Sequence, residues 1–196
     1  MSGKINETQN WIGRERPIQF SAQMVRAILD GSKKQTRRAI VPEPDTIRRI
    51  RNVPHPLREG KLIACQFGQD ADRLWVRERW AKETDQFFYA ADAACGLALH
   101  SAKPQTTNVP LRWRPSYLMP RSACRILLQI TSLRIERLAR ITRADARDEG
   151  YPRDGVNDDP IRWFRTLWDG LCKPQHLWKM DPWVWVIGFK RIDTTE

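Results

Sequence analysis

The segment that most constrains the fold is residues 124–138, CRILLQITSLRIERL. Its apolar residues Ile126, Leu128 and Ile130 alternate as in a strand with one buried face. The alternation then resumes one residue out of phase at Leu133. Such a shift predicts a β-bulge, which bends a strand. We therefore expect a long bent strand in a small, strongly curved sheet or barrel.

Three other segments have strand character. Residues 72–81 place apolar side chains on one face, and residues 87–92, FFYAAD, are expected to pair with them. Residues 182–192 predict a final strand. Its expected buried face consists of Trp183, Trp185, Ile187 and Phe189, and that of 72–81 consists of Leu74, Val76 and Trp80.

Capping residues predict three short helices. Ser21 begins the first helix and Gly31 ends it. Thr142 with Asp145 resembles a capping pair that opens a second helix, which runs through Glu149 to Gly150. Asp159 followed by proline opens the third. The order of elements predicts an α+β domain, with a small mixed β-barrel and short helices packed at one side.

The composition of the chain predicts the domain boundaries. Residues 1–16 are polar and unpatterned, so we expect a flexible tail, and residues 17–192 are expected to form a single domain. Residues 42–70 and 93–120 show no strong period, and we interpret them as basic, irregular insertions.

Charge favours a polyanionic partner. The chain has 196 residues, a formal net charge of +11 and a pI near 10, which favours nucleic acid. The four cysteines form no CxxC, and the three histidines lack ligand spacing, so we expect no metal and no cofactor. No apolar run reaches the length of a membrane span, and no signal-peptide core is present. We therefore expect a cytoplasmic protein with no membrane contact.

The octapeptide GSKKQTRR, residues 31–38, concentrates positive charge after the first helix. Like charges lower the pKa of Lys33, and such an amine can act as a general base or hold an oxyanion. Thr36 is a weak nucleophile that needs such a base. On an extended chain, residues 33 and 36 point to opposite faces, so we predict a turn over 32–35. The structural alternatives are a solvated Lys33 at the helix end, a Thr36 paired in a strand, and a Glu149 that only ends a helix.

The spacing of Gly31, Lys33, Thr36 and Arg38 resembles GxKxxTxR, the signature of the ASCH family, whose fold is similar to the PUA barrel of RNA-modifying enzymes. Most of residues 16–192 look like phage and prophage members of that family. The segments that carry this likeness are RPIQFSAQMVRAILDG, DRLWVRERWA, WRPSYLMPR, ARITRADARDEG and PWVWVIGF. The resemblance implies a cleft beside the first helix.

The resemblance also implies roles for single residues. Members have been linked to RNA binding, to RNA cleavage and, in one small bacterial group, to amide hydrolysis of acetylated cytidine. The matching catalytic positions are Lys33, Thr36 and Glu149, with Gly31, Lys34, Arg37 and Arg38 beside the ligand. This chain is roughly twice as long as that group, a difference in the range of a small domain, which leaves open a lid, a different substrate, or a binding role without catalysis.

Two further basic segments are candidates for nucleic-acid contact. Trp113 lies between Arg112 and Arg114, a combination that suits stacking on single-stranded nucleic acid, although a tryptophan that plugs one end of the barrel would fit equally well. The first insertion holds a basic cluster that is either a phosphate track or a solvated face: Arg48, Arg49 and Arg51.

Three functions fit the sequence. The first is binding of RNA, rather than DNA, or of a modified nucleoside or nucleotide, in a cleft formed by the 31–38 segment. The second is a hydrolase, either an amidohydrolase on acylated cytidine or a ribonuclease. The third is a phage adaptor that binds another protein and uses its charge only for solubility.

Overall fold

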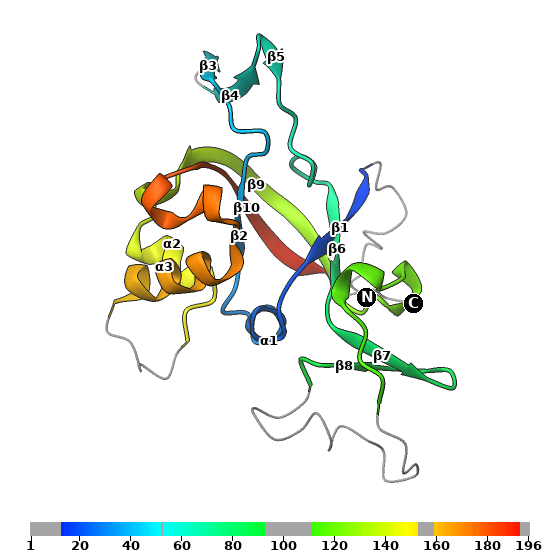
Figure 1. The fold of residues 1–196 in the computed structure, drawn as a ribbon. Helices are drawn as coiled ribbons and strands as arrows, with labels where there is room; N and C mark the ends of the chain where they lie inside the picture. Colours follow the sequence, from blue (N-terminus) through cyan, green and yellow to red (C-terminus); the bar gives the residue numbers. More distant parts are fainter. Residues whose placement is uncertain (1–12, 52, 93–110, 153–158, 193–196) are drawn as a thin grey trace, which may run out of the picture.

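The computed structural model describes residues 13–51, 53–92, 111–152 and 159–192. Together they form a mixed α+β structure around a five-stranded sheet (Figure 1). Strands β1 and β6 are parallel, and the other neighbours in this sheet are antiparallel. The strand order is β1 (Glu15–Gln19), β6 (Arg73–Arg77), β9 (Leu127–Arg137), β10 (Trp183–Ile192) and β2 (Gln35–Ala39).

The predicted bulge in the long strand is confirmed. In the β9–β10 pairing, Ser132 lies opposite Gly188 and Ile130 lies opposite Phe189, so Thr131 is the extra residue. A Cβ atom on Gly188 would lie 2.4 Å from the Ser132 hydroxyl oxygen, so the tight pairing beside the bulge favours glycine. The bulge lets β9 bend while its apolar side chains stay on one side of the sheet.

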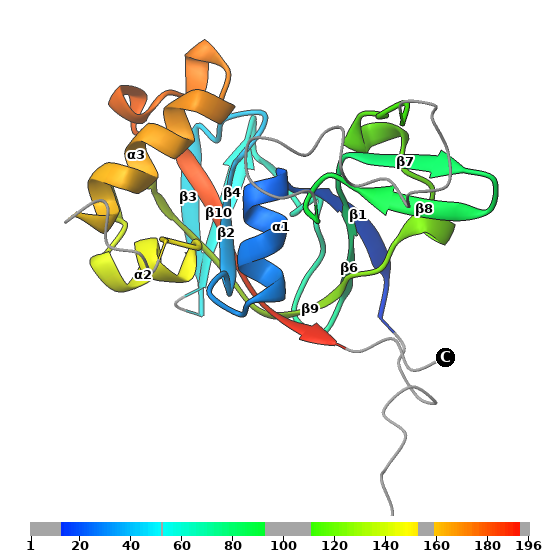
Figure 2. The ribbon, with the colours of Figure 1, turned by 90° about the horizontal axis from the view of Figure 1, so that it is seen from below.

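Strand β10 separates two hydrophobic cores. Trp185, Ile187 and Phe189 face the larger core, on the side of helix α1 (Ala22–Leu29). Val184 and Val186 face the smaller core, beneath α2 (Arg143–Asp148) and α3 (Pro160–Leu171). Figure 2 shows α1 between the α2–α3 pair and strands β7 and β8. The predicted face of the last strand is confirmed.

The predicted helix ends are confirmed. The Ser21 hydroxyl accepts a hydrogen bond from the Met24 amide, and Thr142 and Asp145 form a complete capping box. Asp159 caps α3, which has proline in its first turn. Gly31 and Gly150 follow their helices with φ values of +76° and +97°.

The single strand expected over 72–81 is wrong in extent. It divides into β6 and β7 (Trp80–Glu83), and β7 pairs with β8 (Gln86–Tyr89). The strand is interrupted at Glu78. The buried carboxylate of Glu78 binds Arg125, and its amide donates to the Met119 sulfur. Trp80 therefore packs against Met119, not beside the apolar residues of β6. The expected partner, 87–92, pairs with the second of the two strands.

The first insertion is more regular than expected. Residues 42–70 contain a separate antiparallel sheet of β3 (Thr46–Ile50), β4 (Val53–Arg58) and β5 (Lys61–Leu62), which projects from the main sheet (Figure 1). Most side chains of β3 and β5 are exposed, and β4 carries Pro54 and Pro56. Without one continuous buried face, these strands have no alternating pattern to detect.

The second insertion and the tail are described only in part. Residues 93–110 and 1–12 lie outside the described residues. Strand β1 begins at Glu15, inside the segment expected to be a tail. The last residues of the second insertion contain the 3₁₀ turn η1 (Ser116–Leu118), which η2 (Arg121–Ala123) follows. Three more such turns are η3 (Leu138–Arg140), η4 (Pro174–His176) and η5 (Trp178–Met180).

Among the described strands, no pairing between β1 and β2 closes a barrel, so these strands are the two edges of the sheet. One side chain nevertheless joins the edges. The Arg38 guanidinium of β2 donates a 2.6 Å hydrogen bond to the main-chain oxygen of Gln19 at the end of β1. The sheet is therefore curved enough to bring its edge strands within reach of one arginine. No helix in the described ranges has the length and apolarity needed to span a membrane.

Candidate functional site

The 31–38 segment leads from α1 into β2 without the turn that we predicted. Residues 33–39 run extended, and the turn lies earlier, at Asp30 and Gly31. The Lys33 amide donates to the Ala27 carbonyl at 2.8 Å, and the Lys34 amide donates to the Asp148 carbonyl at 2.7 Å. These bonds hold the segment between α1 and the end of α2, so the predicted turn over 32–35 is wrong.

Lys33 and Glu149 form a buried ion pair although 116 residues separate them in sequence. The Lys33 amine lies 2.9 Å from a carboxylate oxygen of Glu149 and 2.8 Å from its main-chain oxygen. The two side chains are 0% and 2% exposed. A charge this deeply buried needs a close opposite charge, which each of these residues supplies to the other.

Arg37 binds the second oxygen of the same carboxylate. Its guanidinium lies 3.1 Å from Glu149 Oε1, donates to Glu136 and lies 3.4 Å from Asp145. The Arg134 guanidinium donates to Asp145 at 2.6 Å. Three cations and three carboxylates thus form one network between β2, β9 and α2, which we call the charge network: Lys33, Arg37, Arg134, Glu136, Asp145 and Glu149.

Burial lowers the pKa of Lys33; Glu149 opposes this effect, and the nearby Arg38 and Arg37 reinforce it. For Asp145, burial raises the pKa, but hydrogen bonds from Thr142 and the charge of Arg37 outweigh it and lower the pKa to about 2. The network therefore holds a lysine that gives up its proton more readily than usual and a carboxylate that keeps its charge in moderate acid.

Thr36 is buried within β2. Its register partner is Ile187 of β10, and alternation along β2 places Thr36 and Arg38 on the face opposite Arg37. The Arg38 guanidinium lies 5.2 Å from the centre of the Phe20 ring. The structure thus brings Lys33 and Glu149 together, and the Lys33 amine lies 5.7 Å from the centre of the same Phe20 ring. Of the other predicted ligand residues, Gly31 and Lys34 are exposed.

The Arg112–Arg114 segment lies elsewhere. Arg114 pairs with Trp80 through main-chain hydrogen bonds of 2.7 and 3.2 Å, and its guanidinium lies 5.1 Å from the Trp80 ring centre. Trp113 is half-buried and Arg112 is exposed. Figure 2 shows β7, and so this segment, on the side of α1 away from α2. These residues do not join the charge network.

Sequence reasoning missed half of the network. Arg134 and Glu136 belong to the bent strand, where we used only the apolar positions, and Asp145 was interpreted only as a helix cap. One signal was present, because Arg134 and Glu136 lie two apart on β9 and therefore share a face. Sequence spacing alone does not show which face meets β2.

A cavity of about 790 Å³ lies between the projecting sheet and the main sheet. Strands β4 and β5 contribute one side, and the opposite side comes from β9, from Trp185 of β10 and from residues near Asp72. A smaller hollow on α3 is lined by Arg162, Trp163, Thr166 and Leu167. Neither space is lined by Lys33, Thr36 or Glu149.

Within the described ranges, no group of three or more His, Cys, Asp or Glu side chains is placed to hold a metal ion. The free cysteines Cys65, Cys124 and Cys172 are half-buried. Comparison with protein-family models, with curated proteins and with solved structures found no match for this chain.

Proposed function

We propose that this protein binds RNA through the basic surface of its projecting sheet, carried on a body of the PUA-like, ASCH type. Two features of the body support that type: a curved sheet with a bulged central strand, and helices α2 and α3 packed on one face. The GxKxxTxR segment lies directly after the first helix and fastens it to α2.

One observation carries the proposal, namely where the positive charge remains uncompensated. Lys33 and Arg37 of the motif are buried and bound to carboxylates, so they offer little charge to a partner in solvent. The cluster Arg48, Arg49 and Arg51 is instead exposed, and none of these three forms an ion pair within the described part of the chain. Exposed arginines of this kind bind phosphates and release counterions.

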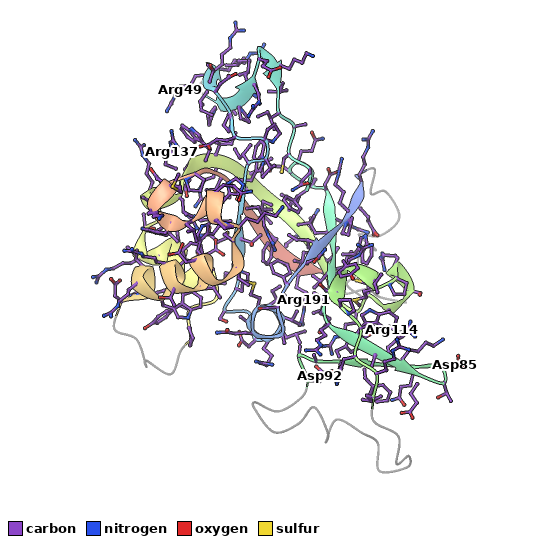
Figure 3. The ribbon with its side chains drawn as sticks, in the orientation of Figure 1. Arg49, Asp85, Asp92, Arg114, Arg137 and Arg191 are labelled. Atoms are coloured by element: carbon purple, nitrogen blue, oxygen red, sulfur yellow. The ribbon has the colours of Figure 1, made fainter. Side chains whose placement is uncertain are left out.

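The surroundings of this cluster suit a single strand. Arg137 of β9 lies close to the base of the projecting sheet, 3.7 Å from Glu43, and Figure 3 shows it below Arg49. Ile50, Val53 and Leu62 expose about half of their surface or more on the same small sheet. Arginines beside exposed apolar side chains provide contacts for both the phosphates and the bases of a single strand.

The test is fluorescence anisotropy with a labelled RNA of about twelve nucleotides, titrated between about 50 and 200 mM salt. Replacing Arg48, Arg49 and Arg51 together by alanine should weaken binding by at least about tenfold at low salt and reduce the salt slope by about two. The slope should fall because each lost phosphate contact in single-stranded RNA removes about 0.7 from it.

The matched control removes the same charge from another face. Arg147, Arg162 and Arg165 are exposed on α2 and α3, and their replacement by alanine should change affinity and slope much less. If both triple variants lose the same affinity, the loss follows from net charge and not from the position of the arginines. If the wild-type protein does not bind RNA, the proposal is contradicted. The same sequence as DNA tests the choice of RNA.

A second candidate is amide hydrolysis of an acylated cytidine. It is favoured by the contact between the Lys33 amine and Glu149, together with the lowered pKa of Lys33. Incubation with N4-acetylcytidine should then release cytidine and acetate, and Lys33→Met should abolish the release without weakening RNA binding. If the wild-type protein releases no cytidine, the pair of Lys33 and Glu149 has only a structural role.

A further inference from the structure

We propose that the cavity beneath the projecting sheet binds a nucleoside 5′-monophosphate group, either as a free nucleotide or at the end of an RNA strand. The choice of a nucleotide rests on the proposed function. The cavity lining includes none of Arg48, Arg49 and Arg51 and shares only Arg134 with the charge network, and it gives three arguments for this ligand.

The first argument is shape. The main sheet lines one side of the cavity with Leu133, Ile135 and Trp185, and the projecting sheet and the residue after it line the other with Pro54 and Ile63. Two apolar walls that face each other suit a flat ring. The volume of about 790 Å³ falls within the usual range of small-molecule sites, so a nucleotide can enter as a whole.

The second argument is charge. Arg14, Arg16 and Arg134 line the cavity together with His55, and Asp72 is the carboxylate among the lining residues. Arg134 is already bound to Asp145 of the charge network. Arg14 is exposed, and its guanidinium forms no ion pair within the described ranges, so its donors are left for a ligand.

The third argument is that Asp72 is fully occupied by the protein itself. One carboxylate oxygen accepts the Arg14 amide at 2.8 Å, and the other accepts the Gln69 amide at 3.1 Å and the Arg16 guanidinium at 3.0 Å. A Cβ atom on Gly68 would lie 2.5 Å from this carboxylate, which shows how closely the loop encloses it. The lining therefore favours an anion, because its negative group is already neutralised.

Cys65 provides a direct reporter, since its thiol belongs to a residue that lines the cavity. Burial raises the pKa of Cys65, so alkylation by iodoacetamide is best followed at an alkaline pH, by mass spectrometry of each cysteine peptide. With AMP, CMP, GMP or UMP at about ten times Kd, only about a tenth of the protein is unliganded, and alkylation of Cys65 should slow about tenfold. Cys124 and Cys172 do not line the cavity, and their rates should stay unchanged.

A pair of variants tests the anion contact. Arg14→Ala should weaken nucleotide binding by about tenfold in calorimetry, because it removes a charge-assisted contact to phosphate. Arg165→Ala removes another exposed arginine, from α3, and should leave the affinity unchanged. The uncharged nucleosides should bind more weakly than their monophosphates by a similar factor. Equal binding of nucleoside and nucleotide would overturn the assignment of phosphate to this site.

The two sources of the ligand are separated by oligonucleotides with and without a 5′-phosphate. If only the phosphorylated RNA protects Cys65, the strand end enters the cavity; if only mononucleotides protect it, the ligand is the free nucleotide. RNA binding that depends on Arg48, Arg49 and Arg51 without any protection of Cys65 would overturn this inference and leave the proposed function standing. Protection of Cys65 by mononucleotides without RNA binding would support this inference and overturn the proposed function.

Discussion

At the scale of single residues, the charge network makes the largest demand on stability. Glu149 neutralises both Lys33 and Arg37, and all three side chains are almost fully buried. Glu149→Gln would leave Lys33 without its only described carboxylate partner, so we expect a loss of about 3–5 kcal/mol in the free energy of unfolding, measured in urea. The control is Glu59→Gln, at an exposed residue whose distant ion pair with Arg58 contributes little.

Replacing both partners separates charge from packing. Lys33→Met with Glu149→Leu removes the two charges and keeps apolar volume in their place, so this double variant should be more stable than Glu149→Gln alone. Arg37 retains Glu136 and Asp145 in that variant. If the double variant were less stable than Glu149→Gln, the cost of burying an unpaired Lys33 charge would not explain the instability of Glu149→Gln.

Asp145 gives the network its acid dependence. Its pKa is about 2 in the folded protein and near 3.8 in the unfolded chain. The unfolded chain therefore binds the proton first, so the stability from Asp145 is complete above about pH 4 and is lost as the pH falls towards 2. We expect the stability difference between wild type and Asp145→Asn to shrink over this interval in urea titrations. A difference that stays constant from pH 5 to the lowest accessible pH would contradict it.

The sequence could predict only part of this network. Two residues three apart on an extended chain point to opposite faces, and the segment from Lys33 to Thr36 is extended where we predicted a turn. The link from Lys33 to Glu149 came from the family resemblance, because no local rule connects positions 116 apart. The place of Arg134 depends on the direction in which β9 bends, which only the packed sheet defines.

At the scale of elements, Gly150 controls how closely α2 approaches α1. It has φ of +97°, and a Cβ atom there would lie 3.0 Å from that of Ala27 and 3.2 Å from that of Lys33. Gly150→Ala should therefore cost at least about 1–3 kcal/mol in urea unfolding, from backbone strain and crowding together. Gly170→Ala is the control: it lies in α3 with open space around it, and alanine there should stabilise by about 0.5–1 kcal/mol.

Elements with strong local signals were predicted well. Caps at Ser21, Thr142 and Asp159 depend on neighbouring residues alone, and the bulge followed from the phase of the buried side chains. The break after β6 was missed because Trp80 continues the alternation of that strand in sequence but packs in another cluster. The projecting sheet was missed because its exposed faces leave no period.

At the scale of the whole molecule, the buried charge network lies in the body, and an exposed basic cluster lies on the projecting sheet. The charge network of the body pairs Lys33 and Arg37 with carboxylates, whereas the projecting sheet carries Arg48, Arg49 and Arg51 in solvent. None of the residues that form the two cores lies in 45–62. Folding and binding should therefore be separable by removing that segment.

Replacing residues 45–62 by a Gly-Ser linker of about six residues tests this separation. The body should keep the helical signal of its circular dichroism spectrum and a cooperative unfolding transition, because both cores remain complete. RNA affinity at low salt should fall by at least about tenfold, and Cys65 should lose its protection by mononucleotides. A loss larger than that of the triple arginine variant would show that the cavity walls add to the phosphate contacts. If the shortened protein folds and binds RNA as wild type does, the binding surface must lie on the body, and Arg112 and Arg114 would be the next arginines to replace.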